Sequence, residues 1–332
     1  MNMRFVPYER LDSSPNIIVD GAAGTGTILT LSHWPKSGTP AGLKRDTSAE
    51  IVFAYLDSPA FHVRAEIVSN NHFDEDGLIG IFALVDPATG EKYRNLLIDA
   101  ANAGDFGVFK HRDAARIAFA ISAYADPETS PLPAELFALP YPQMASQLYG
   151  RLLKVLPRLL TNLGAFKQFW EAEDEKLAAS EELIEKGGIT IEEKPAVDLA
   201  IAHIPEHLAT QPVHRFTQRR LAECHPFALH TRTDCSRLLI LQGRHVEFHY
   251  RYESWVQLAS RRPPPRVDLT ALALELNQEE SSGERWVFDG VERITPRLRL
   301  EGTSTTSFPP ATIQERLERH LATGLPAWNP YD

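Results

Sequence analysis

The sequence predicts an α/β protein organised around a parallel sheet. Over the first 125 residues, short apolar runs alternate with segments of helical period, and this alternation is typical of parallel sheets. Two of the apolar runs, residues 15–21 and 61–71, end in turns that carry acidic side chains. The length of 332 residues also favours more than one domain.

The bulk composition narrows the class of protein. No apolar run approaches the roughly 18 residues that span a bilayer, and residues 1–15 lack the apolar segment of a secretion signal. The two cysteines, Cys224 and Cys235, argue against a disulfide framework, so we expect a cytoplasmic protein. The net charge of −10 argues against broad binding to duplex nucleic acid. It is compatible with a small phosphorylated substrate.

The first elements alternate in a simple order. Residues 15–21, PNIIVDG, predict a short buried strand, and the glycines behind it allow a tight turn. Residues 31–40 form a loop by their proline, glycine and serine content, and a helix is expected over residues 45–56. Residues 61–71 predict the next strand. The order strand, helix, strand predicts that the two strands are parallel neighbours joined by a right-handed crossover.

The second strand leads into the acidic stretch SNNHFDEDG and then into an apolar helix over residues 77–85. Residues 91–109 repeat part of this pattern, with an apolar run that carries Asp99 and a glycine-flanked turn at Asp105. Residues 113–125 are helical by their period and their alanines. Acidic side chains are therefore expected near the ends of several apolar segments.

The sequence pattern changes after residue 127. Residues 128–142 are rich in proline and leucine, and apolar residues then recur at helical spacing from 148 to 170. Beyond Gly187, apolar strand-like runs mix with two helices, residues 267–278 and 313–323. We expect an α/β metal-binding domain at residues 1–130 and a helical spine at residues 131–188. A C-terminal substrate-binding domain of α/β or α+β type is expected at residues 189–332.

The acidic turn is the most informative stretch. It places His72, Asp74, Glu75 and Asp76 within five positions, where neighbouring carboxylates repel each other unless solvent or a cation separates them. On an extended backbone His72, Asp74 and Asp76 would point the same way, and Glu75 elsewhere. Ligands bind beyond the carboxyl ends of parallel strands, and an imidazole with two carboxylates suits Mn²⁺, Mg²⁺ or Fe²⁺. A solvated turn that caps the following helix is the alternative.

The pattern His72-x-Asp74-x-Asp76-Gly77 after an apolar strand resembles the first motif of the DHH phosphoesterase superfamily. The segments RDTSAEIVFAYL and AGDFGVF are similar to two further segments of that superfamily. Its members use two Mn²⁺ ions to hydrolyse nucleic acids, short oligonucleotides, cyclic dinucleotides, pyrophosphate or polyphosphate. The resemblance covers the first half of the chain by motif and the second half by architecture.

The resemblance implies a site with two divalent cations, Mn²⁺ in preference to Mg²⁺. The implied metal ligands are His72, Asp74, Asp76, Asp20 and one of Asp99 or Asp105. The first four would also be the catalytic residues. For Asp20, Asp99 and Asp105, a plain turn residue is the alternative interpretation.

The chain also departs from that superfamily. It has no Asp-His-His motif: the triplet after the first strand is Asp20-Gly21-Ala22, and the nearest histidine is His33. The segments also follow a different order. This order suits a circularly permuted relative, an unrelated α/β protein, or a bacterial family with no assigned function.

Candidate substrate-binding residues are less sharply defined. Arg251 could bind a phosphate group of the substrate, and the aromatic rings of Tyr252 and Trp255 could stack on a base. His33 is a further candidate for substrate binding. A half-buried strand is the alternative for residues 251–255. A zinc site is also conceivable at Cys224, His225, His230 and Cys235, although this spacing matches no common zinc finger.

Three functions are consistent with these observations. The first is a metal-dependent phosphoesterase acting on a small phosphorylated substrate or on short single-stranded nucleic acid. The second is a catalytically inactive, DHH-like binding or regulatory protein, which the missing Asp-His-His motif favours. The third is a different α/β hydrolase or transferase that uses a single Mg²⁺.

Overall fold

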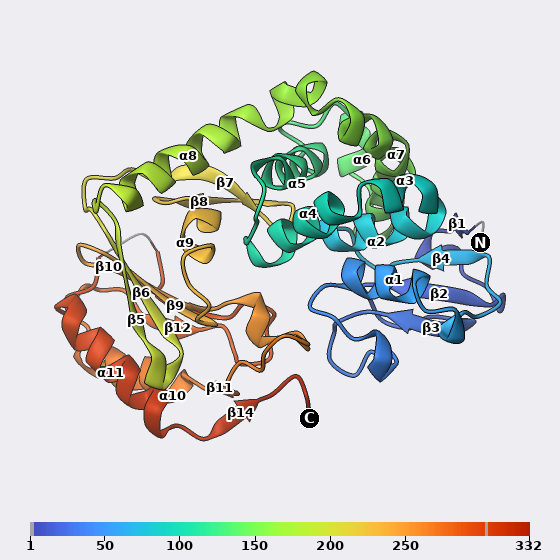
Figure 1. The fold of residues 1–332 in the computed structure, drawn as a ribbon. Helices are drawn as coiled ribbons and strands as arrows, with labels where there is room; N and C mark the ends of the chain where they lie inside the picture. Colours follow the sequence, from blue (N-terminus) through green and yellow to red (C-terminus); the bar gives the residue numbers. More distant parts are fainter. Residues whose placement is uncertain (1–2, 303–304) are drawn as a thin grey trace. The chain divides into compact units, whose positions relative to one another are not determined.

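The computed structural model describes residues 3–302 and 305–332, and these form two compact units (Figure 1). The first unit contains the chain up to Leu177, together with residues 212–222 and 258–260. The second unit contains the other described residues. The division falls within α8 (Glu171–Glu185), so the expected helical spine is shared between the units. Among the described residues, no helix is long and apolar enough to cross a membrane.

The first unit combines a small sheet with a group of helices (Figure 1). Its first four strands are β1 (Arg4–Phe5), β2 (Asn16–Val19), β3 (Thr27–Leu31) and β4 (Ile67–Ser69). Its helices before α8 are α1 (Ser48–Leu56), α2 (Glu75–Val85), α3 (Pro87–Lys92), α4 (Arg94–Phe106), α5 (Arg112–Ala125), α6 (Ala134–Phe137) and α7 (Tyr141–Thr161). Short 3₁₀ helices lie at Tyr8–Arg10, Ala41–Leu43, Pro59–Phe61 and Leu163–Phe169.

The sheet of the first unit is parallel throughout, with the strand order β1-β4-β2-β3. The predicted parallel pairing of the two apolar strands is confirmed, since Ile17 of β2 pairs with Val68 of β4. Every residue of β2 is buried, as expected for a central strand with both faces covered. The carboxyl ends of β2, β3 and β4 therefore lie at one edge of the sheet.

Helices α1 and α2 pack against these strands, and α4 packs on both helices. Helix α1 begins with a capping box in which Thr47 and Glu50 each accept a hydrogen bond from the other's backbone amide. Helix α2 approaches β2 closely because it has Gly80 at the contact. A Cβ atom at that position would lie only 2.7 Å from a methyl carbon of Val19.

Two segments of the first unit differ from the expected structure. Residues 27–31 form β3 where no strand is predicted; their threonine, isoleucine and leucine residues suit a strand. Residues 94–106 form the single helix α4 rather than an apolar run and a turn. Since each helical residue adds about 100°, Asp99 and Asp105 lie on different faces of α4, roughly 120° apart around the helix axis.

A hairpin from the second half of the chain also belongs to the first unit. Strands β7 (Gln211–Arg215) and β8 (Gln218–Ala222) pair with each other and are joined by Phe216 and Thr217. The hairpin is held close to its turn by His214, whose Nε2 lies 2.9 Å from an Asp126 oxygen. The amide of His214 also donates a hydrogen bond to Glu173 (2.7 Å).

We expect the stability of the first unit to depend on pH through His214. Burial alone would lower the pKa of His214, but Glu173 and Asp126 outweigh it and raise the pKa above its ordinary value. The stabilisation is therefore fully present below about pH 6.5 and is lost as the pH rises through the raised pKa. Replacing His214 by glutamine should cost about 2 kcal/mol at pH 6 and less at pH 9.

Urea unfolding of wild type and His214→Gln at the two pH values measures this effect. The variant His207→Gln is a matched control because His207 is exposed. An equal loss of stability at pH 6 and pH 9 in the His214 variant would show that the charge of His214 does not contribute.

The second unit is built around a mixed six-stranded sheet of order β12-β13-β10-β9-β6-β5, in which only β6 and β9 run parallel. The strands of this sheet are β5 (Thr190–Lys194), β6 (Leu199–Ile204), β9 (Arg237–Gln242), β10 (His245–Tyr250), β12 (Trp286–Phe288) and β13 (Arg297–Leu300). The other two strands of the second unit, β11 (Arg266–Val267) and β14 (Pro326–Trp328), pair with each other. Its helices are α9 (Pro226–His230), α10 (Thr270–Glu279) and α11 (Pro310–Thr323), with 3₁₀ helices at Pro195–Val197 and Tyr252–Ser254.

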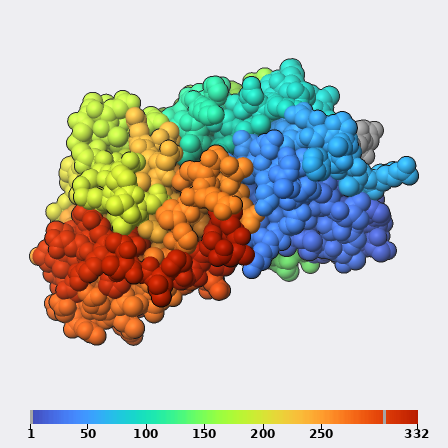
Figure 2. Space-filling view, turned by 60° about the horizontal axis from the view of Figure 1, so that its bottom comes forward, coloured from blue at the N-terminus to red at the C-terminus, as the bar shows by residue number. Residues whose placement is uncertain are grey.

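The two predicted helices of the second unit, α10 and α11, cover its core. Helix α11 buries Ile313, Leu317 and Leu321 along one face, the spacing of an amphipathic helix. Its other face contributes to the surface of this unit, within the red segment of Figure 2. One expectation is wrong: the strand does not continue through residues 251–255, because β10 ends at Tyr250 and a 3₁₀ turn follows.

Candidate metal centre

Polar side chains follow the ends of three adjacent strands in the first unit. Asp20 comes directly after β2, His33 comes two residues after β3, and His72 lies in the turn after β4. Asp20 has a φ of 50°, in the left-handed region that side-chain-bearing residues rarely adopt. Its amide still donates to the Leu31 carbonyl oxygen (3.0 Å). The backbone therefore turns sharply after β2, and the Asp20 carboxylate is 1% exposed.

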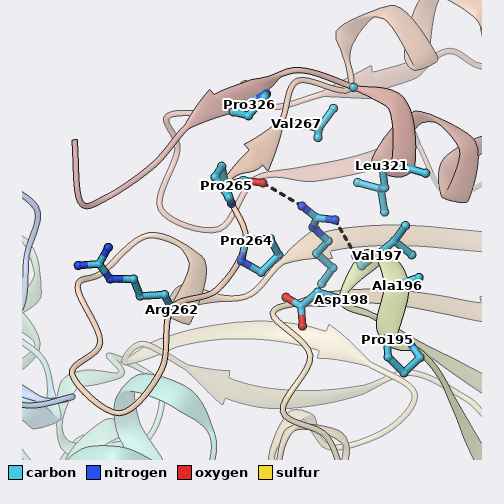
Figure 3. A pocket seen from close by; sticks show the side chains of 13 residues that line it. Pro195, Ala196, Val197, Asp198, Arg262, Pro264, Pro265, Val267, Leu321 and Pro326 are labelled. Atoms are coloured by element: carbon cyan, nitrogen blue, oxygen red, sulfur yellow. Dashed lines mark hydrogen bonds between the residues drawn. The ribbon is translucent and has the colours of Figure 1, made fainter.

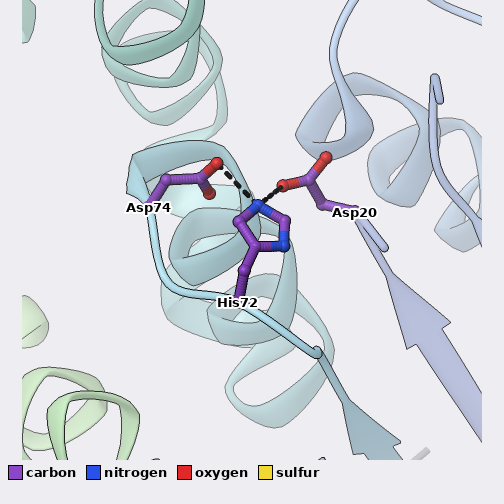
Figure 4. A group of neighbouring side chains, drawn as sticks. All are labelled: Asp20, His72 and Asp74. Carbon is purple, nitrogen blue, oxygen red and sulfur yellow. Dashed lines mark hydrogen bonds and ion pairs between the residues drawn. The ribbon is translucent and has the colours of Figure 1, made fainter. Parts of the chain in front are cut away.

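The first group of ligand atoms consists of Asp20, His72 and Asp74. Figure 4 shows the His72 ring between the two carboxylates. The Nε2 atom of His72 lies 2.8 Å from Asp74 Oδ2 and 3.2 Å from Asp20 Oδ2. The second oxygen of Asp74 accepts a hydrogen bond from the Gly77 amide and caps α2. The indole of Trp34 stacks on the His72 ring, with 5.0 Å between ring centroids.

The second group consists of Asp20, His33 and Asp76, with Asp105 beside it. The Nε2 atom of His33 lies 3.5 Å from Asp20 Oδ1 and 3.5 Å from Asp105 Oδ2. The other ring nitrogen, Nδ1, lies 2.6 Å from the Asp46 carbonyl oxygen, which can only accept a hydrogen bond. Nδ1 therefore donates to this carbonyl oxygen, and Nε2 faces two carboxylates, the arrangement of a metal-ligating histidine.

Asp20 belongs to both groups. Its Oδ2 faces His72, and its Oδ1 faces His33 and accepts a hydrogen bond from the Ser48 hydroxyl (2.8 Å). Asp76 is held by the start of α1, because its two oxygens accept hydrogen bonds from the Ser48 and Ala49 amides, each 2.7 Å long. The amino terminus of α1 thus compensates part of the negative charge of the cluster.

Burial and mutual repulsion make this cluster unusual electrostatically. Burial, followed by the charges of neighbouring aspartates, raises the pKa values of Asp76 and Asp105 well above their ordinary range. Burial would also raise the pKa of Asp20, but the hydrogen bond from His72 and the charges of His72 and His33 lower it to about 2. Burial would lower the pKa of His72, yet Asp74 and Asp20 raise it well above its usual value. Divalent cations stabilise such packed carboxylates.

The structure separates the two alternative acidic residues of α4. Asp105 lies next to His33 and is 1% exposed. Asp99 instead accepts hydrogen bonds from the backbone amides of Lys110 and His111, each 2.8 Å long, and so fixes the turn before α5. Of the two alternatives, Asp105 is therefore the one that lies beside the metal-capable groups, and a metal-binding role of Asp99 stays a prediction.

Glu75 and Asp76 already lie in α2, so the extended backbone assumed for residues 72–76 is wrong, and Glu75 is held outside the two groups. Its Oε1 accepts a hydrogen bond from the Ser122 hydroxyl (2.5 Å), and burial raises its pKa to about 7. Helix α4 passes so close that a Cβ atom at Gly104 would lie 2.5 Å from the Cβ of Glu75. The glycine is therefore required for this contact between α2 and α4.

Ser48 and Asp46 were not expected to contribute to the centre. Ser48 donates to Asp20 and presents its amide to Asp76, and the Asp46 carbonyl orients His33. Both lie at the start of α1, and the predicted helix over residues 45–56 was the available signal. Its amino terminus should lie at the same edge of the sheet as the carboxyl ends of the strands.

The candidate substrate residues Arg251, Tyr252 and Trp255 lie in the second unit. The Arg251 guanidinium is buried and donates to the carbonyl oxygens of Thr233 (2.7 Å) and Cys235 (3.0 Å). Tyr252 is buried, and the Trp255 ring stacks on it with 6.0 Å between centroids. Arg251 thus holds neighbouring backbone in place, and the role of all three residues in substrate binding stays a prediction.

The two groups that share Asp20 are the metal-capable groups among the described residues. The alternative zinc site at Cys224, His225, His230 and Cys235 is not one of them. Both cysteines are buried free thiols. Burial raises the pKa of the Cys224 thiol to about 11, so without a bound metal it is a protonated thiol at neutral pH.

A separate hollow of about 490 Å³ lies in the second unit (Figure 3). Its lining is rich in proline and also includes Asp198, Arg262 and the buried side chain of Arg237. Arg237 donates hydrogen bonds to the carbonyl oxygens of Val197 (2.6 Å) and Pro265 (2.9 Å). This arginine therefore braces the two walls.

Together, the fold and the site define an α/β protein with a buried aspartate–histidine centre that could hold metal ions. The whole chain, residues 1–332, matches the model of a family of unknown function, DUF6687, and the protein belongs to that family. A search of curated proteins and a search of solved structures each found no match to this chain.

Proposed function

We propose that the protein is a divalent-metal-dependent hydrolase of phosphoester or phosphoanhydride bonds. The observation that carries the proposal is the position of Asp20, whose two carboxylate oxygens face two different histidine–aspartate groups. A carboxylate shared in this way is what a two-cation centre requires. Two-metal hydrolases of phosphoesters hold their cations about 3.5–4 Å apart.

The residues present fit two hard cations. The first cation would be held by His72, Asp74 and Asp20, and the second by His33, Asp76, Asp105 and the other oxygen of Asp20. Imidazole nitrogens and carboxylate oxygens without a thiolate suit Mn²⁺ or Mg²⁺, and we expect Mn²⁺ because histidine contributes to both groups. The Asp46 carbonyl already orients His33 as a ligand.

When bound, two such cations supply an activated water and neutralise the charge that develops on the leaving oxygen. The protein contributes the rest. Asp20 links the two groups, since one of its oxygens faces each of them. The amino terminus of α1 holds Asp76 through the Ser48 and Ala49 amides. Trp34 restrains the His72 ring by stacking on it. These contacts fix the positions of the ligand side chains, and such preorganisation is what hydrolysis requires.

The resemblance to the DHH superfamily adds support only through the residues that carry it. The match to DUF6687 connects the chain to no DHH protein. In the proposed centre, His33 and Asp105 complete the second group in the absence of an Asp-His-His motif. We infer a substrate that is a small phosphorylated molecule or short single-stranded nucleic acid, and a cytoplasmic location.

A hydrolysis screen tests the proposal. Purified full-length protein would be incubated with Mn²⁺, with Mg²⁺ or with EDTA, and with dinucleotides, cyclic dinucleotides, pyrophosphate and short oligonucleotides. We expect cleavage of at least one of these substrate types with Mn²⁺, and none with EDTA. Metal binding without cleavage of any of them would instead favour a binding or regulatory protein that keeps the metal centre.

A further inference from the structure

The hairpin β7–β8 brings one arginine to the edge of the candidate metal centre. Its two connecting residues, Phe216 and Thr217, have φ values of 52° and 56°, and this left-handed pair is the geometry of a tight two-residue turn. Arg215 directly precedes the turn and is 5% exposed. Its guanidinium lies over the ring of Phe216, 3.5 Å from the ring centroid.

Arg215 contacts the last turn of α4. Its Nη1 donates a hydrogen bond to the Gly104 carbonyl oxygen (2.5 Å), and its Nη2 donates to the Asp105 carbonyl oxygen. These carbonyls lie at the carboxyl end of a helix, where no intrahelical amide is available to them. A cation at this end is also favoured by the helix dipole. Arg215 thus caps α4 at the residue that carries the Asp105 carboxylate.

The same turn also contacts Glu75 of α2, which leaves no room for a side chain at Gly104. The last turn of α4 is therefore contacted both by α2 and by the hairpin arginine. Within this arrangement the Asp105 Oδ2 atom is buried, makes no hydrogen bond and lies 3.5 Å from His33 Nε2. A carboxylate oxygen in that state is available as a ligand.

We propose that Arg215 is a positioning residue for the second cation, because it fixes the last turn of α4 and so holds the Asp105 carboxylate opposite His33. This inference rests on the proposed two-cation centre. It also gives the hairpin a role: residues 212–222 belong to the first unit, although the chain on both sides of them belongs to the second. The second cation site is therefore completed by a segment from the C-terminal half of the chain.

The hairpin does not depend on Arg215 for its attachment. His214 contacts Glu173 and Asp126, and Lys176 donates to the Pro212 carbonyl oxygen (2.5 Å). Replacing Arg215 should therefore leave the hairpin in place and loosen only the end of α4. Partners that orient metal ligands typically change metal affinity by about 10- to 100-fold when removed.

The test is Mn²⁺ binding to the full-length chain by calorimetry, with manganese per chain measured after desalting. We expect two sites in wild type. In Arg215→Met the second site should be about 10- to 100-fold weaker and the first unchanged. Arg215→Lys keeps the charge but cannot donate to both carbonyl oxygens in the same way. Its affinity for the second Mn²⁺ should lie between those of wild type and Arg215→Met. Arg219→Met removes the same charge from an exposed position on the hairpin that pairs with Glu128, and should bind as wild type does.

The outcomes separate this inference from the proposed function. Two sites of unchanged affinity in Arg215→Met would overturn the role of Arg215 and leave the two-cation centre standing. Equal weakening of both sites would also overturn it, because a general loss of structure does not select one cation. If wild type binds no Mn²⁺, both proposals fail. Should Arg215→Met not fold, Arg215→Lys decides by the same comparison of the two sites.

Discussion

Replacement of Asp20 by asparagine should remove both cations and lower any Mn²⁺-dependent hydrolysis by roughly a thousandfold or more, since each tenfold corresponds to about 1.4 kcal/mol and metal ions contribute several. Asp20 is the residue that both ligand groups share. An amide has one oxygen and no charge, so it can serve neither as a bridge nor as a counter-charge. Loss of the bridging oxygen or of the negative charge is enough to release the cations from a site made of mutually repelling carboxylates.

The fold should survive this replacement. Asparagine adopts the left-handed conformation of residue 20 more readily than most residues, and its amide oxygen can still accept the hydrogen bond from Ser48. Manganese per chain and the rate of hydrolysis are the measurements. Asp12→Asn is the control, because it makes the same change at an exposed position. If Asp20→Asn keeps two manganese ions, Asp20 does not bridge them.

The part of the site that could be predicted is the part encoded locally. His72 and Asp74 lie in one short turn, so their spacing alone indicates that they converge. The pairing of β2 with β4 can also be predicted from the sequence, because two apolar strands separated by a helix typically form a parallel pair. Asp20 then follows from the topology, because adjacent parallel strands bring their carboxyl ends to one edge.

The second ligand group could not be derived in the same way. His33 and Asp105 are 72 residues apart in the sequence, taking the difference of their numbers, and meet only through β3 and α4. The apolar run around Asp99 is short and fits a strand as well as a helix, and periodicity does not separate these for short runs. Once the segment is helical, Asp99 and Asp105 diverge and only Asp105 reaches His33.

Arg215 lies still further from any local signal. The hairpin belongs to the first unit through contacts with residues about 40 to 110 positions away, such as Glu173 and Gly104. No periodicity encodes such contacts. In the sequence Arg215 is one basic residue among several, and only the packed structure distinguishes it from Arg219 on the same hairpin.

Binding of Mn²⁺ should raise the thermal stability of the first unit in two equal steps. Binding to the folded state adds about 2.7 kcal/mol per site at a hundredfold excess over Kd, so two sites add roughly 5 kcal/mol. The melting temperature should then rise on the order of 10 °C. The physical source is the cluster itself, in which Asp20, Asp74, Asp76 and Asp105 are buried together.

A series of variants makes this expectation quantitative and ties it to the two groups. His33→Gln should keep about half of the Mn²⁺-induced stabilisation, because the first group is intact, and Asp20→Asn should keep almost none. Differential scanning calorimetry with Mn²⁺ and after EDTA measures each increment. Equal shifts in wild type and both variants would place the binding on the acidic surface of the chain, away from Asp20. A shift halved in His33→Gln and absent in Asp20→Asn is the result expected for two cations held by one bridging carboxylate, since Asp20 is the residue that both groups share.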